Sequence, residues 1–135
     1  MNKAYLKKII AQSGEDLKII SALCSEGTLK ISDIKFLKKN QIFLISINRN
    51  AKELENDQSR INSIIRFEYI YNSRSKNIDQ KNHNEELKLL SIEVFKKNNI
   101  FEIMLLFSDN KIITLSAEII EVILEDQKLE KDENN

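Results

Sequence analysis

The chain has 135 residues, of which 41% are hydrophobic and 31% are charged. A chain of this length forms one domain and buries roughly two-thirds of its unfolded surface. The composition excludes a disordered chain and a membrane protein. Lys plus Arg and Asp plus Glu both number 21, so no net field attracts the molecule to phosphate backbones or anionic lipid.

Several classes of signal are missing from the sequence. The N-terminal segment carries lysines inside its apolar stretch, so we do not expect a signal peptide. Cys24 is the single cysteine and has no zinc-site spacing around it, which favours a cytoplasmic location. With Gly14 and Gly27 as the only glycines, the chain lacks a phosphate-cradling loop. No cofactor is therefore expected.

The first elements are a strand and a helix. Residues 5 to 11 alternate weakly, which favours a short strand. Ser13 and Asp16 then form a capping-box pattern, which predicts a helix over about residues 15–25. Apolar residues at helical spacing, including Leu17 and Cys24, form one stripe, and Gly27 stands where a C-terminal cap belongs.

After the helix the hydrophobic period becomes that of strands. From 85 to 126 the chain repeats an apolar run, a tight turn and another apolar run, as in an antiparallel meander. The apolar residues from 119 to 124 fit the period of a strand and also that of a helix. Residues 128–135 form a charged tail that we expect to be disordered, so the globular domain is expected over 1–127. The predicted strands are 28–31, 34–37, 42–48, 61–71, 87–95, 100–107, 111–117 and 119–124, with polar loops at 50–59 and 72–86.

These elements predict an α+β fold. It consists of an antiparallel, mostly meandering sheet of about seven strands, curled into a partly closed barrel or sandwich, with one principal N-terminal helix. Strand 42–48 is apolar on both faces: Phe43 and Ile45 lie on one face and Leu44 on the other. Such a strand cannot remain in an open single layer, so curling or dimerisation must cover the second face.

Few residues are candidates for chemistry. His83 is the only histidine, and no carboxylate or thiol stands at motif spacing, so we interpret it as an exposed loop residue. Cys24 lies near the helix C-terminus, where the dipole disfavours a thiolate, so we place it in the core. A divalent cation could bind an acidic cluster, but no calcium-loop motif accompanies it, so a solvated face is favoured and no metal is expected. The cluster is Glu118, Glu121, Glu125 and Asp126.

Two further patterns have competing interpretations. An aromatic stripe of Phe67, Tyr69 and Tyr71 could stack unpaired bases with help from flanking arginines at 60, 66 and 74. An aromatic stripe at period two is more often one side of a core, so we do not favour nucleic-acid binding. Arg49, at the end of a buried strand, either pairs with a carboxylate such as Asp33 or Glu118 or binds an anionic ligand. We favour the structural pair.

Short segments in colinear order resemble the bacterial family known as domain of unknown function 2948. The resemblance implies a strand at 5–11 running into the capped helix and a final strand at 120–126. It also marks five polar positions as the first to test for ligand binding: Asp33, Asn48, Arg49, Arg60 and Glu121. The matching segments are Glu15-Asp16-Leu17, Ile20-Ser21-Ala22, Asp33, Phe43 to Asn48-Arg49, Arg60, Phe67, Leu89-Leu90-Ser91-Ile92, Leu105-Leu106-Phe107, Ile120-Glu121-Val122 and Leu124-Glu125-Asp126.

Three functions are compatible with the sequence. The first is a non-enzymatic protein-interaction module, with an unknown protein partner or a second copy in a homodimer, because the apolar strand faces exceed what one helix covers. The second is a small-ligand or anion-binding barrel anchored by Arg49 and Arg60. The third is an enzyme that uses the carboxylates of Asp33 and Glu121. A membrane partner is not expected.

Overall fold

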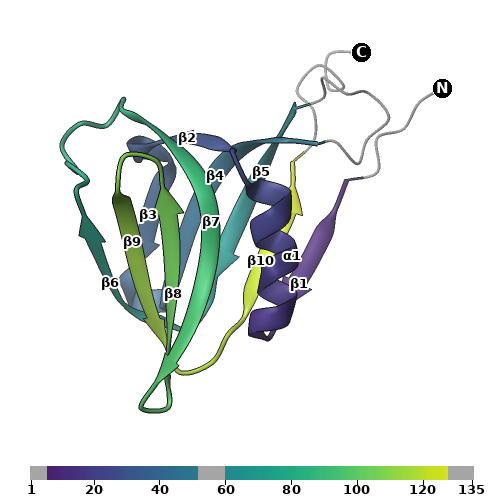
Figure 1. The fold of residues 1–135 in the computed structure, drawn as a ribbon, viewed down its shortest axis with the longest axis vertical. Coiled ribbons are helices and arrows are strands. Elements are labelled where there is room, and N and C mark those ends of the chain that lie inside the picture. Colours follow the sequence, from purple (N-terminus) through teal and green to yellow (C-terminus); the bar gives the residue numbers. More distant parts are fainter. Residues whose placement is uncertain (1–5, 52–59, 128–135) are drawn as a thin grey trace.

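The computed structural model describes residues 6–51 and 60–127. The described residues form an α+β fold, as predicted, with one α-helix, α1 (Gly14–Cys24), and a mostly antiparallel meandering sheet (Figure 1). The sheet has ten strands where the sequence predicts about seven. They are β1 (Lys8–Ala11), β2 (Thr28–Lys30), β3 (Ile34–Leu37), β4 (Ile42–Asn50), β5 (Arg60–Phe67), β6 (Ile70–Lys76), β7 (Glu86–Lys97), β8 (Ile100–Phe107), β9 (Lys111–Ala117) and β10 (Val122–Asp126).

The sheet branches at β4. The hydrogen-bonded order is β1-β10-β5-β4-β2-β7-β8-β9-β6, and all neighbouring strands are antiparallel. The remaining strand, β3, also pairs with β4. One edge of β4 therefore carries β5, while its other edge is shared by β3 and β2. This branching lets the sheet curl into a partly closed barrel (Figure 1).

The barrel remains open between β3 and β6, and we call this opening the seam. No ladder joins these two strands among residues 6–51 and 60–127. A backbone hydrogen bond of 2.8 Å from Ile70 N to Gln41 O ties β6 to the start of β4. The connection from β6 to β7 crosses the other end of the seam, where Ser32 N donates to His83 O at 3.0 Å. Both ends of the seam are thus held by backbone hydrogen bonds.

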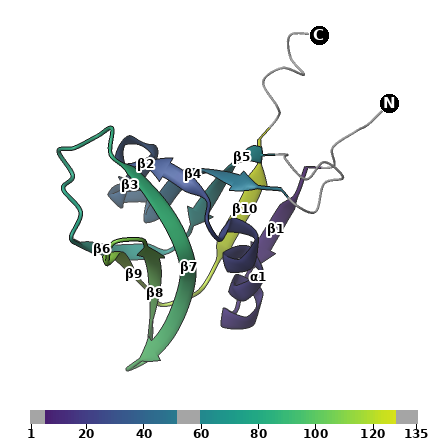
Figure 2. The ribbon, with the colours of Figure 1, turned by 45° about the horizontal axis from the view of Figure 1, so that its top comes forward.

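Helix α1 begins where the capping pattern predicts. The Ser13 hydroxyl accepts from Asp16 N at 3.1 Å, which satisfies one of the free N–H groups of the first turn. Leu17, Ile20 and Cys24 are buried, and Figure 2 shows the helix beside β7, β10 and β1. The expectation that Cys24 belongs to the core is confirmed.

Gly27 has a role other than the predicted helix cap. The left-handed position after α1 is Glu26, with φ 68°. A Cβ at Gly27 would lie 2.7 Å from Ile47 Cδ1 and 2.9 Å from the Cys24 carbonyl oxygen. Both distances are shorter than van der Waals contact, so this glycine is required by the close approach of α1 to β4.

The predicted strand 61–71 is wrong as a single element. β5 ends at Phe67, and the chain bends at Tyr69, whose φ is 61°, before β6 begins. Phe67 is fully buried, whereas Tyr69 and Tyr71 are 47% and 40% exposed. The predicted aromatic stripe is therefore divided between two strands. The loop predicted at 72–86 is also shorter than expected, because β6 continues to Lys76.

The remaining boundaries agree closely with the sequence pattern. The final strand implied at 120–126 is β10, and the strand at 34–37 is β3. The tail at 128–135 and most of the loop at 50–59 lie outside the described residues, as does residue 5 of the first strand. No helix in the described part of the chain is long and apolar enough to cross a membrane.

Candidate functional site

Arg49 lies on the buried face of the sheet, where it forms an ion pair with Asp126. We call Arg49, Asp126 and the adjoining Ser63 the Arg49 cluster. Side chains alternate along β4, so Arg49 follows Phe43, Ile45 and Ile47 onto the buried face. Arg49 Nε donates to Asp126 Oδ1 at 3.1 Å, and Nη2 donates to Oδ2 at 2.8 Å. The expected structural pair is present, but its carboxylate is Asp126 and the suggested partners Asp33 and Glu118 were wrong.

Asp126 is held by more than the arginine. The Ser63 hydroxyl donates to Asp126 Oδ1 at 2.6 Å, and Lys7 N donates to Oδ2 at 2.9 Å. Burial alone would raise the pKa of this carboxyl, but the hydrogen bonds from Arg49, Ser63 and Lys7, with the charge of Arg49, lower its pKa below 3.8. Asp126 is therefore a charged structural partner and not a proton donor.

Three of the five polar positions lie on the outer face of β4 and β5 or beside it. Arg60 donates to the side-chain oxygen and the backbone carbonyl of Asn48, and Asn48 Nδ2 donates to Asn62 Oδ1 at 2.9 Å. Asp33 accepts from Lys30 N at 2.9 Å, which closes the short turn before β3. Asp33 and Asn48 line a shallow depression of about 330 Å³. These polar groups largely satisfy one another.

The other two predicted positions lie elsewhere. Arg49 points to the opposite face of β4 from Asn48, because neighbouring side chains in a strand alternate. Glu121 precedes β10 and accepts from Gln12 Nε2 at 3.4 Å. Its neighbour Val122 pairs with Phe67, at the far end of β5 from Asn62, so about 16 Å of strand separate Glu121 from the Asp33 depression. The carboxylates of Asp33 and Glu121 are not brought together.

The strongest candidate site is a cavity at the seam, which we call the seam pocket. Its volume is about 580 Å³. Apolar side chains line it from both sides of the seam, with Ile78 and Ile113 on the side of β6: Ile31, Ile34, Phe36, Phe43, Ile78 and Ile113. Phe36 and Phe43 contact each other with ring centroids 6.0 Å apart. The pocket therefore offers an aromatic and aliphatic surface inside the barrel wall.

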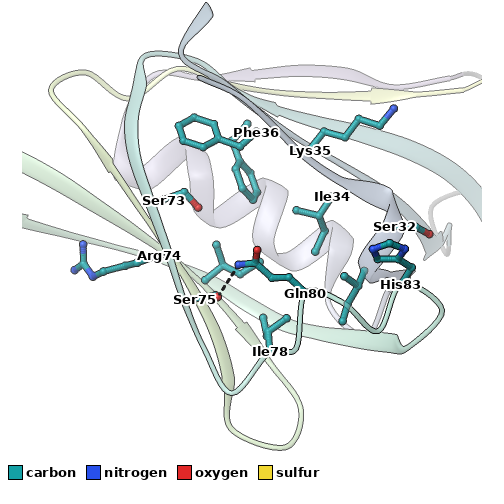
Figure 3. Close-up of a pocket in the computed structure, with 13 residues that line it drawn as sticks. Ser32, Ile34, Lys35, Phe36, Ser73, Arg74, Ser75, Ile78, Gln80 and His83 are labelled. Atoms are coloured by element: carbon teal, nitrogen blue, oxygen red, sulfur yellow. Dashed lines mark hydrogen bonds between the residues drawn. The ribbon is translucent and has the colours of Figure 1, made fainter. Parts of the chain in front are cut away.

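Uncharged polar groups enter the pocket from the side of β6. Figure 3 shows Ser73 and Ser75 of β6 and Gln80 of the β6–β7 connection directed toward Ile34 and Phe36. Gln80 Nε2 donates to Ser75 Oγ at 3.4 Å. Ser73 Oγ makes no hydrogen bond within the described residues. Inward-facing serines leave space where a larger side chain would fill the barrel.

The charged residues of the pocket lie at its margin. In Figure 3 Arg74 extends away from the cavity, and its Nη2 atom pairs with Glu102 at 2.9 Å. The Lys35 ammonium also extends away from the cavity centre (Figure 3). His83 is exposed, as expected for a loop residue, and lines the end of the cavity near Ser32. The interior of the pocket is neutral and largely apolar.

Ser73, Ser75 and Gln80 were missed by sequence reasoning. All three lie in the polar stretch 72–86, whose composition indicates a loop. The alternation Ser73-Arg74-Ser75 was the available signal. It places small residues on one face and a charged residue on the other. Only the pairing of β6 with β9 shows that the segment is a strand and that its two serines face inward.

The remaining candidates do not form sites. Glu125 is exposed and Asp126 is buried, so alternation separates two members of the acidic cluster. The arginines that flank the aromatic residues are engaged: Arg66 pairs with Glu68 at 2.7 Å and Arg74 with Glu102. Because Phe67 is buried while Tyr69 and Tyr71 are exposed, the aromatic stripe also lacks the shared face that base stacking requires.

Comparison with known proteins gives one finding. A family model described as protein of unknown function (DUF2948) matches residues 7–134. Neither the curated proteins nor the solved structures contain a match to this chain. The match covers the helix, all ten strands and the seam pocket.

Proposed function

Because the chain belongs to the DUF2948 family, whose description carries no activity, we propose its function from the geometry: it is a non-enzymatic binding protein that holds a small molecule in the seam pocket. One observation supports this most strongly. Six apolar side chains line the pocket, and two serines and a glutamine enter it from the side of β6. Ligand sites in proteins combine a mostly apolar surface with a few convergent polar groups in this way.

The pocket also constrains the ligand. Its volume of about 580 Å³ is in the range of small-molecule sites. An anion is disfavoured, because burying an unpaired charge in neutral surroundings is costly and both Lys35 and Arg74 extend outward. Arg49 cannot serve as an anion anchor, because it pairs with Asp126. The ligand is therefore a neutral, largely apolar molecule with hydroxyl or carbonyl groups.

Binding of Nile red tests this proposal, because the dye is neutral and apolar and its emission rises in apolar surroundings. Ser75→Leu fills the pocket and should weaken dye binding about 10-fold or more, equivalent to about 1.4 kcal/mol. Ser46→Leu is the matched control, because Ser46 is exposed on the outer face of the neighbouring β4. It should leave the dye affinity unchanged.

Two results would contradict the ligand-binding function. One is the absence of saturable dye binding by the wild-type protein. The other is equal dye affinity in the wild type and in Ser75→Leu, with circular dichroism showing that the variant is folded. Either result places the apolar surface of the seam in a structural role.

A second candidate function is the protein-interaction module. It is supported by exposed apolar side chains along β7, where Leu90 is 46% and Phe95 is 53% exposed. Isolated exposed apolar residues are common, but these two flank a depression of about 770 Å³ between β7 and α1. This side of β7 is therefore the surface at which a protein partner would bind.

A further inference from the structure

Half of β7 has an open edge. On one side β7 pairs with β8 from Leu89 to Lys97. On the other side β2 pairs with Glu86 to Lys88, and Leu89 exchanges backbone hydrogen bonds with Glu26 and Gly27 just before β2. Further along, Ile92 N donates to the Ser21 hydroxyl of α1 at 2.8 Å. From residue 93 to residue 97, no described strand pairs with this second edge.

The turn after β7 determines which backbone groups face the open edge. Asn98 and Asn99 form a two-residue turn, with φ 54° and 65°. In such a hairpin the flanking residues Lys97 and Ile100 form a hydrogen-bonded pair, so the odd-numbered residues of this half of β7 bond to β8. The N–H and C=O groups of Val94 and Lys96 therefore point toward the open edge. Ile92, which is also even-numbered, likewise directs its N–H away from β8, toward Ser21.

The side chains on the outward face carry a second pattern. Glu93, Phe95 and Lys97 follow one another at every second position, and all three are exposed. Phe95 lies midway between an acid and a base. Reversing the strand direction exchanges the places of the acid and the base. The pattern is therefore complementary to itself in an antiparallel arrangement.

We propose that a second copy of this chain pairs with this edge, β7 against β7 in antiparallel orientation, about a two-fold axis at Phe95. In this register Val94 of one copy and Lys96 of the second copy form hydrogen-bonded pairs. Glu93 of each copy faces Lys97 of the other, and the two Phe95 rings meet at the centre in a non-hydrogen-bonded pair, where side chains approach most closely. The result is a closed, isologous dimer.

The charge pattern favours a second copy of this chain over an unrelated strand as the partner of this edge. Shifting the register by two residues places Glu93 opposite Phe95 or beyond Lys97, so one register satisfies both ion pairs and the ring contact. Lysines at a sheet edge usually oppose strand pairing. Here Lys97 faces an acid, Glu93 of the second copy, only in the register centred on Phe95. The inference rests on the interaction function and is independent of the seam pocket.

Exchange of the two charges tests the pairing. Glu93→Lys and Lys97→Glu each place like charges opposite each other twice per dimer, so each should raise the dimer dissociation constant about 10-fold. The double variant Glu93→Lys/Lys97→Glu restores the complementary pattern and should return the constant to the wild-type value. Sedimentation equilibrium up to about 1 mM protein measures this, because small interfaces are weak.

Two control variants show whether the effect belongs to the open edge of β7. Glu86→Lys makes the same charge change on the part of β7 that β2 covers and should leave dimerisation unchanged. Ser75→Leu should also leave it unchanged, and Nile red binding should be unaffected in Glu93→Lys, so the dimer and the pocket can fail separately. A monomer at all concentrations, or a double variant as weak as the single ones, would overturn the proposal.

A cross-link supplies a second measurement. In the proposed register the two Phe95 positions are close enough for a disulfide, so Phe95→Cys should form a covalent dimer when diamide accepts the two thiol hydrogens. Ile119→Cys is the control, because Ile119 is similarly exposed but lies outside β7. Equal cross-linking of the two variants would contradict a pairing centred on Phe95.

Discussion

The Arg49 cluster and the seam pocket both place polar side chains on the inward face of the sheet, but they use them differently. In the cluster, the polar groups of Arg49, Ser63 and Asp126 bond to one another within 3.2 Å and are sealed from solvent. In the pocket, Ser73 and Ser75 face an apolar wall and remain accessible. An inward polar residue therefore indicates a ligand only where its hydrogen-bonding capacity is still available.

Removing the cluster's acid should have the largest effect. Asp126→Ala leaves Arg49 buried beside an empty carboxylate position, so the free energy of unfolding should fall by about 3–5 kcal/mol. Urea denaturation measures the change. The matched control is Glu125→Ala, which removes an exposed carboxylate from the adjacent position and should change stability by less than about 0.5 kcal/mol. Equal effects would mean that the cluster is not a buried structural unit.

Acid should weaken the same cluster. The folded pKa of Asp126 lies below 3.8, so its stabilisation is fully present above pH 3.8 and is lost as pH falls through the folded pKa. Asp126→Asn lacks this titration. The difference in unfolding free energy between wild type and Asp126→Asn should therefore shrink at low pH. A difference that stays constant down to about pH 2 would contradict the charged pair.

A matched pair of serine substitutions compares the two regions directly. Ser63→Ala removes a donor to Asp126 and an acceptor for Arg49, so it should destabilise by about 1–3 kcal/mol. Ser75→Ala removes a hydroxyl from the accessible pocket and should change stability by less than about 0.5 kcal/mol. Thermal and urea unfolding distinguish these values. A large loss in Ser75→Ala would show that the pocket hydroxyls are structural.

A small effect on stability is expected where binding changes most. Ser75→Leu adds apolar volume to a cavity that is open to solvent, so its free energy of unfolding should stay within about 1 kcal/mol of the wild-type value. Its affinity for a neutral apolar dye should nevertheless fall. A strong loss of stability with unchanged dye binding would reverse the roles assigned to the two regions.

Local pattern was sufficient for much of the fold. Ser13 and Asp16 mark the start of α1, because a helix needs acceptors for its first N–H groups, and the alternation in β4 identifies its buried face. These features depend on residues within one element. The α+β class, the helix and the final strand could therefore be predicted, as could the place of Arg49 at the end of a buried strand.

Contacts between distant segments decided the rest. The partner of Arg49 is 77 residues away, and only the antiparallel register of β5 with β4 and β10 brings Ser63 and Asp126 beside it. The residues of the polar strand β6 have too low a strand propensity to predict it, and the strand depends on pairing with β9. The seam pocket exists because that pairing holds Ser73 and Ser75 opposite β3. No local pattern records such a distance, so the sequence by itself determined most of the elements, whereas the tertiary structure decided the strand β6 and which side chains meet.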